Sequence, residues 1–494
     1  MQGGYEFDSG RIWRPVVAPL AGLRAGRRPC QGSTGPEKRP IRRRRPMDLT
    51  TALAALKDGT LTARDLAEAC IAARAERPEA RDNPYVAFSA GLLRTQADAA
   101  DIRRAAGQPL GDFDGIPLSL KDNYGTGTVC GGTWPVFAGS PRRLPPMWNQ
   151  PGGVVSRLLG QGAVVTGKTR MVEFAFGGLG ANGHWGTPRN PWDRDHHRVP
   201  GGSSTGAPLS LHEGSALLAL GTDTAGSVRI PAAWNGLYGY KSARGHLATD
   251  GIVPLSPRLD TVGILALTAD DLAHGYRLVT GTAIDPLMDP GVIRIGRAPA
   301  ALWQDCSPGV VAAVDTALDR LTEVFRPVGS VTIPELDEAL ALFRRGGLAG
   351  AEIYGFLGQE LPAWLSSLDA YVGPRIRASA DVLDYDARVA FLDRFANGVQ
   401  ALFHDVDVVA LPTVAITPPL LADLAEPSAY GRANLMALRN CCVANLGDMA
   451  AVTLPVGTDD AGCPVGLQLL APRGADARLL AIAQAAAGYL VGED

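Results

Sequence analysis

The sequence predicts a large α/β fold, and three observations support this class. Short apolar runs bounded by Gly-rich turns begin near residue 110, as in GIPLSLKD, GAVVTGKT and SALLALGTD. These runs alternate with helical stretches, which is typical of buried strands in an α/β sheet. The chain has 494 residues, of which 46% are apolar and 20% charged. It is therefore long and apolar enough to bury a large core, in one large domain or two smaller ones.

Residues 1–46 differ in composition from the rest of the chain. They carry 11 Lys or Arg against three acidic residues, a net charge of +8, and their PIRRRRP run has no convincing periodicity. The whole chain has a net charge of −3, so residues 47–494 carry −11. We interpret 1–46 as a disordered or non-native extension, with an export or organelle signal or a binding arm as alternatives. An acidic body argues against a nucleic-acid partner.

The first folded elements are a helix and three strands. LTARDLAEACIAARAE, residues 61–76, predicts an amphipathic helix with Thr62 as its N-cap. The apolar runs predict strands within 115–122, 162–169 and 215–220.

Later segments predict a further helix and a strand pair. PGVVAAVDTALDRLTEVF, residues 308–325, predicts a helix capped by Ser307 with Pro308 at its first position. AAVTLPVGTDDAGCPVGLQLLAP predicts two strands joined by a turn at 459–462. Residues 335–435 have helical patterning without recognisable chemistry.

Cysteine usage and hydropathy indicate the cellular setting. None of the seven cysteines forms a CxxC pair, so neither a zinc site nor a disulfide framework is indicated. No apolar run approaches the roughly 20 residues that cross a bilayer. We therefore expect a cytoplasmic protein with no membrane partner and no metal or organic cofactor. A homodimer stays open.

Residues suited to catalysis gather in three short segments. They are PLSLKDN with Lys121, PGGSSTGAP with Ser203 and Ser204, and GTDTAGSVRIPAAW with Ser227.

The turn before Ser227 suits an oxyanion hole. After the strand at 215–220 we expect a tight turn at 222–226 and a helix that starts at Ser227, with Pro231 in its first turn. Backbone N–H groups at a helix start are unpaired and lie at the positive end of its dipole. Such groups would stabilise an oxyanion beside the Ser227 hydroxyl. The four residues that would donate them are Thr224, Ala225, Gly226 and Ser227.

A serine nucleophile also needs a base. None of the seven histidines lies in a motif that nominates it. A lysine serves when it is neutral, which requires burial or a positive neighbour to lower its pKa from about 10.4. Lys121 ends the apolar run IPLSL, where burial is expected. The glycines around Ser203 and Ser204 permit the backbone that a proton relay between lysine and nucleophile requires.

Together these segments resemble the signature of the amidase signature family. The run GGSSTGAPLSLHEGSALLALGTDTAGSVRIPA matches the family hallmark, with Ser203 and Ser227 24 positions apart and KDN upstream. The likeness extends over about 50–285 and 440–490. It implies one α/β domain at 47–494, built on a single large mixed β-sheet surrounded by α-helices. Its core would be 110–285 and 440–490, with a variable helical segment at about 335–435.

The resemblance also implies a Ser-cisSer-Lys triad. Ser227 would be the acyl nucleophile, Ser203 the relay serine after a cis peptide bond, and Lys121 the base. Ser204 would support them as the second serine of the loop. The implied reaction hydrolyses the C–N bond of a small carboxamide through an acyl-enzyme, without a cofactor.

Four further residues of the motifs are singled out. Asp223 and Arg229 match family positions that brace the loop, and we expect them to be structural. Ala225 replaces a family glycine, which would impair the oxyanion turn if that position required a positive φ. Thr205 replaces a loop glycine and adds bulk near the relay.

The substrate itself is not predicted, but parts of the pocket are. An apolar wall is suggested by Trp134, Met171 and Phe174. The segments expected to line the pocket are 131–150, 171–184 and 335–435.

Three other functions are left open. Gly202, Ser204 and Gly206 satisfy GxSxG, the nucleophile elbow of Ser-His-Asp α/β hydrolases, in which His274 or His404 would be the base. GGSSTG would alternatively bind phosphate as a loop before a helix, although it lacks the GKS or GKT ending of a P-loop. The chain would alternatively be the amidase component of a glutamine-dependent tRNA amidotransferase, acting with partner subunits.

Overall fold

The computed structural model describes residues 46–490 except 78–81 and 381, and these belong to one compact body. The expectation for the N-terminal extension therefore lies, apart from Pro46, outside the described residues. The helices in chain order are α1 (Leu49–Asp58), α2 (Ala63–Ala75), α3 (Ala90–Ala105), α4 (Gly153–Gly160), α5 (Gly206–Glu213), α6 (Arg229–Trp234), α7 (Ala269–Thr280), α8 (Pro308–Thr322), α9 (Leu336–Arg344), α10 (Ala349–Glu360), α11 (Gly373–Arg377), α12 (Tyr385–Gly398), α13 (Pro427–Leu446) and α14 (Asp476–Leu490).

A single large sheet runs through the body, and a separate small pair consists of β3 (Thr128–Val129) and β4 (Gly132–Thr133). Within the described ranges the large sheet has 11 strands in the order β1-β5-β2-β6-β8-β7-β12-β13-β11-β9-β10. The strands are β1 (Tyr85–Phe88), β2 (Pro117–Lys121), β5 (Val164–Thr169), β6 (Leu218–Asp223), β7 (Tyr238–Lys241), β8 (Thr261–Ala266), β9 (Arg294–Arg297), β10 (Arg326–Ser330), β11 (Val408–Pro412), β12 (Ala450–Thr458) and β13 (Pro464–Ala471).

The sheet is mixed, as predicted. Strand β2 pairs in parallel with β5 and β6, and β9 pairs in parallel with β10 and β11. The pairs β6 with β8, β7 with β8, β7 with β12, and β12 with β13 are antiparallel. Parallel strands are normally buried on both faces by helices, and both faces of this sheet are covered.

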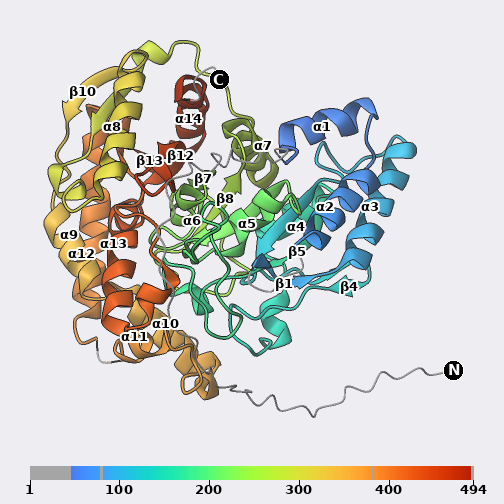
Figure 1. Ribbon diagram of the computed structural model, residues 1–494, viewed down its shortest axis with the longest axis horizontal. Coiled ribbons are helices and arrows are strands. Elements are labelled where there is room, and N and C mark those ends of the chain that lie inside the picture. Colours follow the sequence, from blue (N-terminus) through green and yellow to red (C-terminus); the bar gives the residue numbers. More distant parts are fainter. Residues whose placement is uncertain (1–45, 78–81, 381, 491–494) are drawn as a thin grey trace, which may run out of the picture. The chain divides into compact units, whose positions relative to one another are not determined.

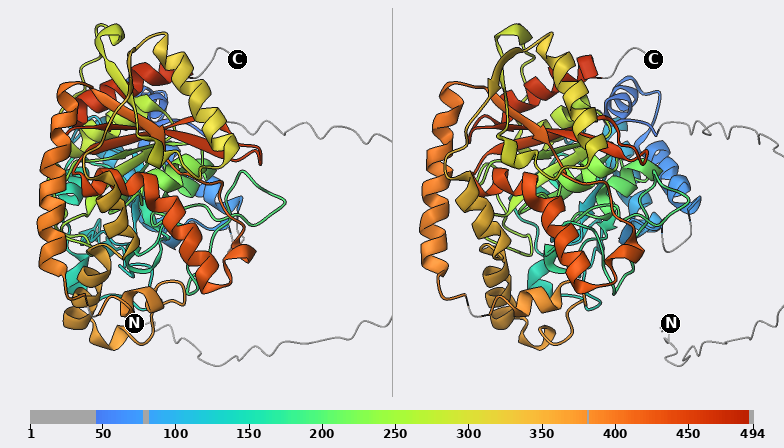
Figure 2. Two further views of the ribbon diagram at one scale, coloured as in Figure 1. Left: turned by 90° about the vertical axis from the view of Figure 1, so that its left-hand side faces the viewer. Right: turned by 60° about the vertical axis from the view of Figure 1, so that its left-hand side comes forward.

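Helices pack on the two faces in separate groups. One face packs against α1, α4, α7, α8 and α14 in the largest apolar cluster. The other face packs against α5 and α6 and, further along the sheet, against α9, α12 and α13. Figure 1 shows α1 to α3 at one end of the body and α8 to α13 at the other. In Figure 2 the strands cross the middle of the body between helices.

The elements predicted around the motifs are confirmed. Strands β2 and β5 lie in the first two apolar runs, and β12 and β13 form the predicted antiparallel pair. Strand β6 lies three residues later than the predicted 215–220, so Thr222 and Asp223, which were predicted in the turn, belong to the strand. Thr62 caps α2 by accepting from the backbone N–H of Asp65, whose side chain in turn accepts from the Thr62 N–H. Helix α8 begins after Ser307 with Pro308 at its first position, but the Ser307 side chain makes no capping hydrogen bond.

Strand alternation directs the lysine of the motif toward the α5 side of the sheet. Leu118 and Leu120 point into the largest apolar cluster. Ser119 points the opposite way, where its Oγ lies 2.9 Å from Oγ of Ser210 in α5. Because side chains alternate along a strand, Lys121 follows Ser119 onto that face. Lys121 also ends β2, which places it at the carboxyl edge where α/β sheets bind ligands.

None of the helices described between residues 46 and 490 is both long and apolar enough to cross a bilayer.

Candidate active site

Lys121 and Ser203 meet inside the protein at the end of β2. Nζ of Lys121 donates to Oγ of Ser203 at 2.8 Å, and also to Oγ1 and O of Thr222 at 2.8 and 3.2 Å. Lys121 and Ser203 have no solvent exposure. The predicted base and the predicted relay are therefore in direct contact.

Burial favours the neutral amine of Lys121. It lowers the pKa of Lys121 to about 7, although the Asp260 and Asp223 carboxylates act in the opposite direction. Asp260 is partly buried, and its desolvation raises its pKa to about 6. Its Oδ1 accepts from Oγ1 of Thr224 at 2.5 Å. Sequence reasoning missed Asp260, because no motif links it to Lys121 and only packing brings the two together.

The GGSSTG loop touches the Ser227 turn directly. The peptide bond between Gly202 and Ser203 is cis, as the resemblance implies. The backbone N–H of Ser204 donates to O of Ser227 at 3.1 Å. Thr205 has a helical backbone conformation, and its hydroxyl donates to O of Ser203 at 3.3 Å. The extra bulk of Thr205 is thus accommodated beside Ser203, which keeps its contact with Lys121.

Ser227 lies on the turn between β6 and α6. The prediction that the helix starts at Ser227 is wrong by two residues, because α6 begins at Arg229 with Val228 as N-cap. Gly226 has a φ of 130°, a conformation that side chains disfavour. Ala225 is not among the residues with positive φ. Its Cβ is therefore compatible with the turn, and the expected penalty does not arise.

The oxyanion donors differ from the prediction at one position. The N–H of Gly226 donates to Oδ1 of Asp223 at 2.7 Å, so it is already used and the prediction of Gly226 as a donor is wrong. The other three predicted donors, Thr224, Ala225 and Ser227, line the cavity described below.

Asp223 and Arg229 brace this turn, as expected. Nη2 and Nε of Arg229 donate to Oδ1 and Oδ2 of Asp223 at 2.8 and 3.1 Å. Arg229 also donates to O of Cys441 at 2.8 Å and to Oδ1 of Asn445 at 2.6 Å. Burial alone would raise the pKa of Asp223, but Arg229 holds it below its usual range. The pair ties the Ser227 turn to α13.

A cavity of about 360 Å³ opens beside Ser227, a size suited to a small molecule. Residues from two of the three predicted lining segments contribute to it, at 175–177 and in the range 343–435. The proposed apolar wall is wrong. Trp134, Met171 and Phe174 are almost wholly buried in the core and do not line this cavity, because large apolar side chains here serve packing.

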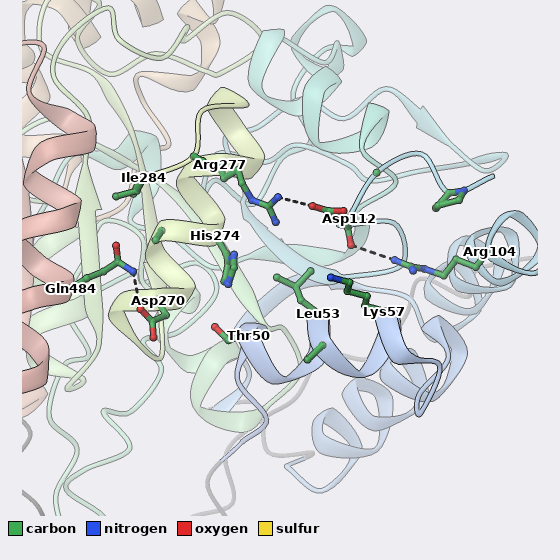
Figure 3. A pocket seen from close by; sticks show the side chains of 15 residues that line it. Thr50, Leu53, Lys57, Arg104, Asp112, Asp270, His274, Arg277, Ile284 and Gln484 are labelled. Carbon is green, nitrogen blue, oxygen red and sulfur yellow. Dashed lines mark hydrogen bonds and ion pairs between the residues drawn. The ribbon is translucent and has the colours of Figure 1, made fainter. Parts of the chain in front are cut away.

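A second pocket, of about 890 Å³, lies between α1, α7 and the loop at 109–112 (Figure 3). In it Arg277 Nη1 donates to Asp112 Oδ2 at 2.5 Å, and Gln484 Nε2 donates to Asp270 Oδ1 at 2.8 Å (Figure 3). It contains His274 but none of the three predicted catalytic residues.

The geometry disfavours two of the alternative functions. His274 lies in this second pocket and His404 is exposed, whereas the Ser204 hydroxyl donates to O of Thr222 at 3.4 Å. Neither histidine is positioned to activate Ser204. Ser203 and Ser204 have no solvent exposure, so their loop is not open to a phosphate. Over the described ranges, no group of three or more His, Cys, Asp or Glu could hold a metal ion.

Sequence and structure comparisons identify the family of this chain. Residues 65–480 match the family described as Amidase, and the chain belongs to the amidase signature family. The 2-amino-5-chloromuconic acid deaminase of Comamonas testosteroni is 44% identical over 444 residues, covering 88% of this chain and 95% of the relative. The chain is accordingly an enzyme of the amidase class, which hydrolyses amide C–N bonds.

Two further similarities are informative. A glutamyl-tRNA(Gln) amidotransferase subunit of Chloroflexus aggregans is 31% identical over 483 residues, covering 89% of this chain and 95% of the relative. A solved structure described as a crystal structure of amidase has a TM-score of 0.79 and 25% identity, covering 89% of this chain and 98% of that chain. The similarity to the amidotransferase is thus weaker than that to the deaminase.

Proposed function

We propose that the chain hydrolyses a small amide through an acyl-enzyme on Ser227. The observation that carries this proposal is the 2.8 Å contact between Lys121 Nζ and Ser203 Oγ, beside a turn whose Ser227 lines a cavity. A buried lysine with a pKa of about 7 is substantially neutral at physiological pH. It therefore accepts a proton without needing a histidine.

The reaction would proceed in two halves. Ser227 Oγ attacks the amide carbon while its proton passes through the Ser203 hydroxyl to Lys121. The same path then returns a proton to the nitrogen, the C–N bond breaks, and the amine or ammonia leaves. Water attacks the resulting ester by the same route and releases the carboxylic acid. Each half ends with Lys121 neutral and Ser203 unchanged.

Backbone donors would stabilise the charge that forms on the carbonyl oxygen. The N–H groups of Thr224, Ala225 and Ser227 belong to residues that line the cavity. Gly226 would shape the turn rather than donate to the oxyanion, because its N–H already donates a hydrogen bond to the Asp223 carboxylate. Donors held in place before the reaction stabilise the oxyanion without reorganising.

The relatives suggest which substrates to try first. The higher identity to the deaminase favours an enzyme that acts alone over a component of an amidotransferase. We therefore place 2-amino-5-chloromuconic acid in the first panel, together with primary amides, aryl amides, amino-acid amides and glutamine. A cytoplasmic location and independence of nucleic acid and membranes remain predictions, and a homodimer stays open.

A labelling experiment tests the proposal. The purified chain should turn over at least one panel compound without partners, and a fluorophosphonate should label Ser227. Ser227→Ala should lose both turnover and label. Ser204→Ala is the matched control, because it removes the neighbouring hydroxyl and should keep the label. A label that maps to Ser204 would contradict the proposal, and activity only with added partner subunits would favour the amidotransferase.

A further inference from the structure

The cavity beside Ser227 carries positive charge without a matching carboxylate. Three arginines line it, and no Asp or Glu is among its described lining residues. These arginines are Arg344, Arg345 and Arg375. Such a concentration of one charge in a partly enclosed space attracts anions.

Arg375 is the most enclosed of the three. It lies on α11, and its Nη2 donates to the carbonyl oxygen of Phe176. Its Cζ lies 4.5 Å from the centroid of the Phe176 ring and 5.4 Å from that of the Tyr430 ring. Arg344 and Arg345 are exposed. The aromatic contacts therefore fix the orientation of the Arg375 guanidinium in advance of any ligand.

No carboxylate of the described residues forms an ion pair with Arg375. Nε of Arg375 and the hydroxyl of Tyr430 are buried with no hydrogen-bond partner among the described residues. The Asp369 carboxylate instead accepts from the backbone N–H groups of Gly183 and Tyr371. Burial lowers the pKa of Arg375 below its ordinary value. Arg375 is half-buried. A partly desolvated cation without an anion is unfavourable, and a bound anion would relieve this cost.

We propose that Arg375 binds the carboxylate of a small substrate that carries both an amide and an acid group. This inference rests on the proposed function, because Arg375 and Ser227 line one cavity and the amide must reach Ser227. A guanidinium offers parallel N–H donors that match the two oxygens of a carboxylate. Arg344 and Arg345 add to the potential that draws the acid in.

Matched substrates test this specificity. Succinamic, glutaramic and adipamic acids each carry a carboxylate, and their diamides replace it with a neutral group of similar size. The wild-type enzyme should have a higher kcat/KM for at least one acid than for its diamide. Arg375→Met should lower that acid-to-diamide ratio by about 10- to 100-fold, the range for a charge-assisted hydrogen bond. A purely structural role would slow acids and diamides equally.

A control lies on the same helix. Arg377 is exposed and does not line the cavity, so Arg377→Met should leave the ratio unchanged. Thermal melting of both variants establishes that they fold. If Arg375→Met does not fold, Arg375→Lys replaces it, since it keeps the charge but loses the paired donors and should still lower the ratio.

A binding measurement separates this inference from the proposed function. Calorimetry with Ser227→Ala protein uses succinate, glutarate and adipate as probes and needs no turnover. Loss of dicarboxylate binding when Arg375→Met is added to Ser227→Ala, but not when Arg377→Met is added, would support the carboxylate site. This result would stand even if the wild-type enzyme hydrolysed no panel compound, a failure that would count against the proposed function alone. The inference is overturned if no acid is preferred or bound, or if Arg375→Met affects acids and diamides equally.

Discussion

Lys121 Nζ lies 2.8 Å from Ser203 Oγ, and both side chains are wholly buried. The other direct partners of the amine are the hydroxyl and carbonyl oxygens of Thr222. Without a carboxylate in contact, burial dominates and favours the neutral amine. A structural lysine would normally be paired with an acid, so this environment favours a role in proton transfer.

The first prediction concerns the base. Lys121→Ala should lower turnover by roughly 10²- to 10⁴-fold, the contribution of general base catalysis. The double variant Lys121→Ala/Ser227→Ala should have nearly the same turnover as Ser227→Ala alone, because both changes disable one shared proton path. Steady-state kinetics measure these effects. The exposed Lys57 gives the control Lys57→Ala, which should keep full activity. Near-normal turnover in Lys121→Ala would rule out its role.

The second prediction is the pH dependence. Burial lowers the pKa of Lys121 from 10.5 to about 7, and only the neutral amine accepts a proton. The kcat/KM should therefore rise through pH 7 and level off above it. Asp260→Asn should shift this rise to lower pH, since the Asp260 carboxylate raises the pKa of Lys121.

The lowered pKa of Lys121 also makes the free energy of unfolding depend on pH. Between pH 7 and 10.5 the unfolded chain keeps a proton on Lys121 that the folded chain has lost. The free energy of unfolding should therefore increase with pH in this range, relative to Lys121→Met. Urea titrations at several pH values measure this free energy.

For the pH–rate prediction, a profile of kcat/KM that is unchanged in Asp260→Asn would show that Asp260 does not affect the pKa of Lys121.

The third prediction compares two adjacent residues of the nucleophile turn. A Cβ at Gly226 would lie 2.6 Å from Cβ of Cys441, at a φ of 130°. Gly226→Ala should therefore destabilise the protein by about 1–3 kcal/mol and displace Ser227. Ala225→Gly should keep its turnover and lose only about 0.4–1 kcal/mol. Urea denaturation and kinetics of the two variants provide the comparison, and equal effects would contradict this account of the turn.

The fourth prediction concerns the structural role of the buried ion pair between Arg229 and Asp223. Arg229→Met leaves the buried charge of Asp223 without its main partner, which should cost about 3–5 kcal/mol. The control is Arg297→Met, which breaks a half-exposed pair with Asp315 and should cost about 0–1 kcal/mol. Chemical denaturation measures both. If Arg229→Met were as stable as Arg297→Met, the Asp223 pair would not be what holds the turn.

Local sequence predicted much of the framework. The apolar runs at 115–122 and 162–169 form strands where expected, because each is short, apolar and bounded by turn residues. The third strand was predicted at 215–220 but spans Leu218–Asp223. The Thr62 cap was also predictable, since the capping interaction spans only three residues. The exact start of α6 was not, because the Asp223 carboxylate reorganises the turn from outside the helix.

The sequence by itself determined the residue types of the site, since Lys121, Ser203 and Ser227 each lie in a motif at a turn or a strand end. Their roles as a triad stay a prediction. Only the tertiary structure decided that Lys121 is buried against Ser203 and that Arg375 lines the cavity with Ser227. The physical reason is that burial, pKa and cavity charge are sums over neighbours distant in the chain, which no local pattern encodes.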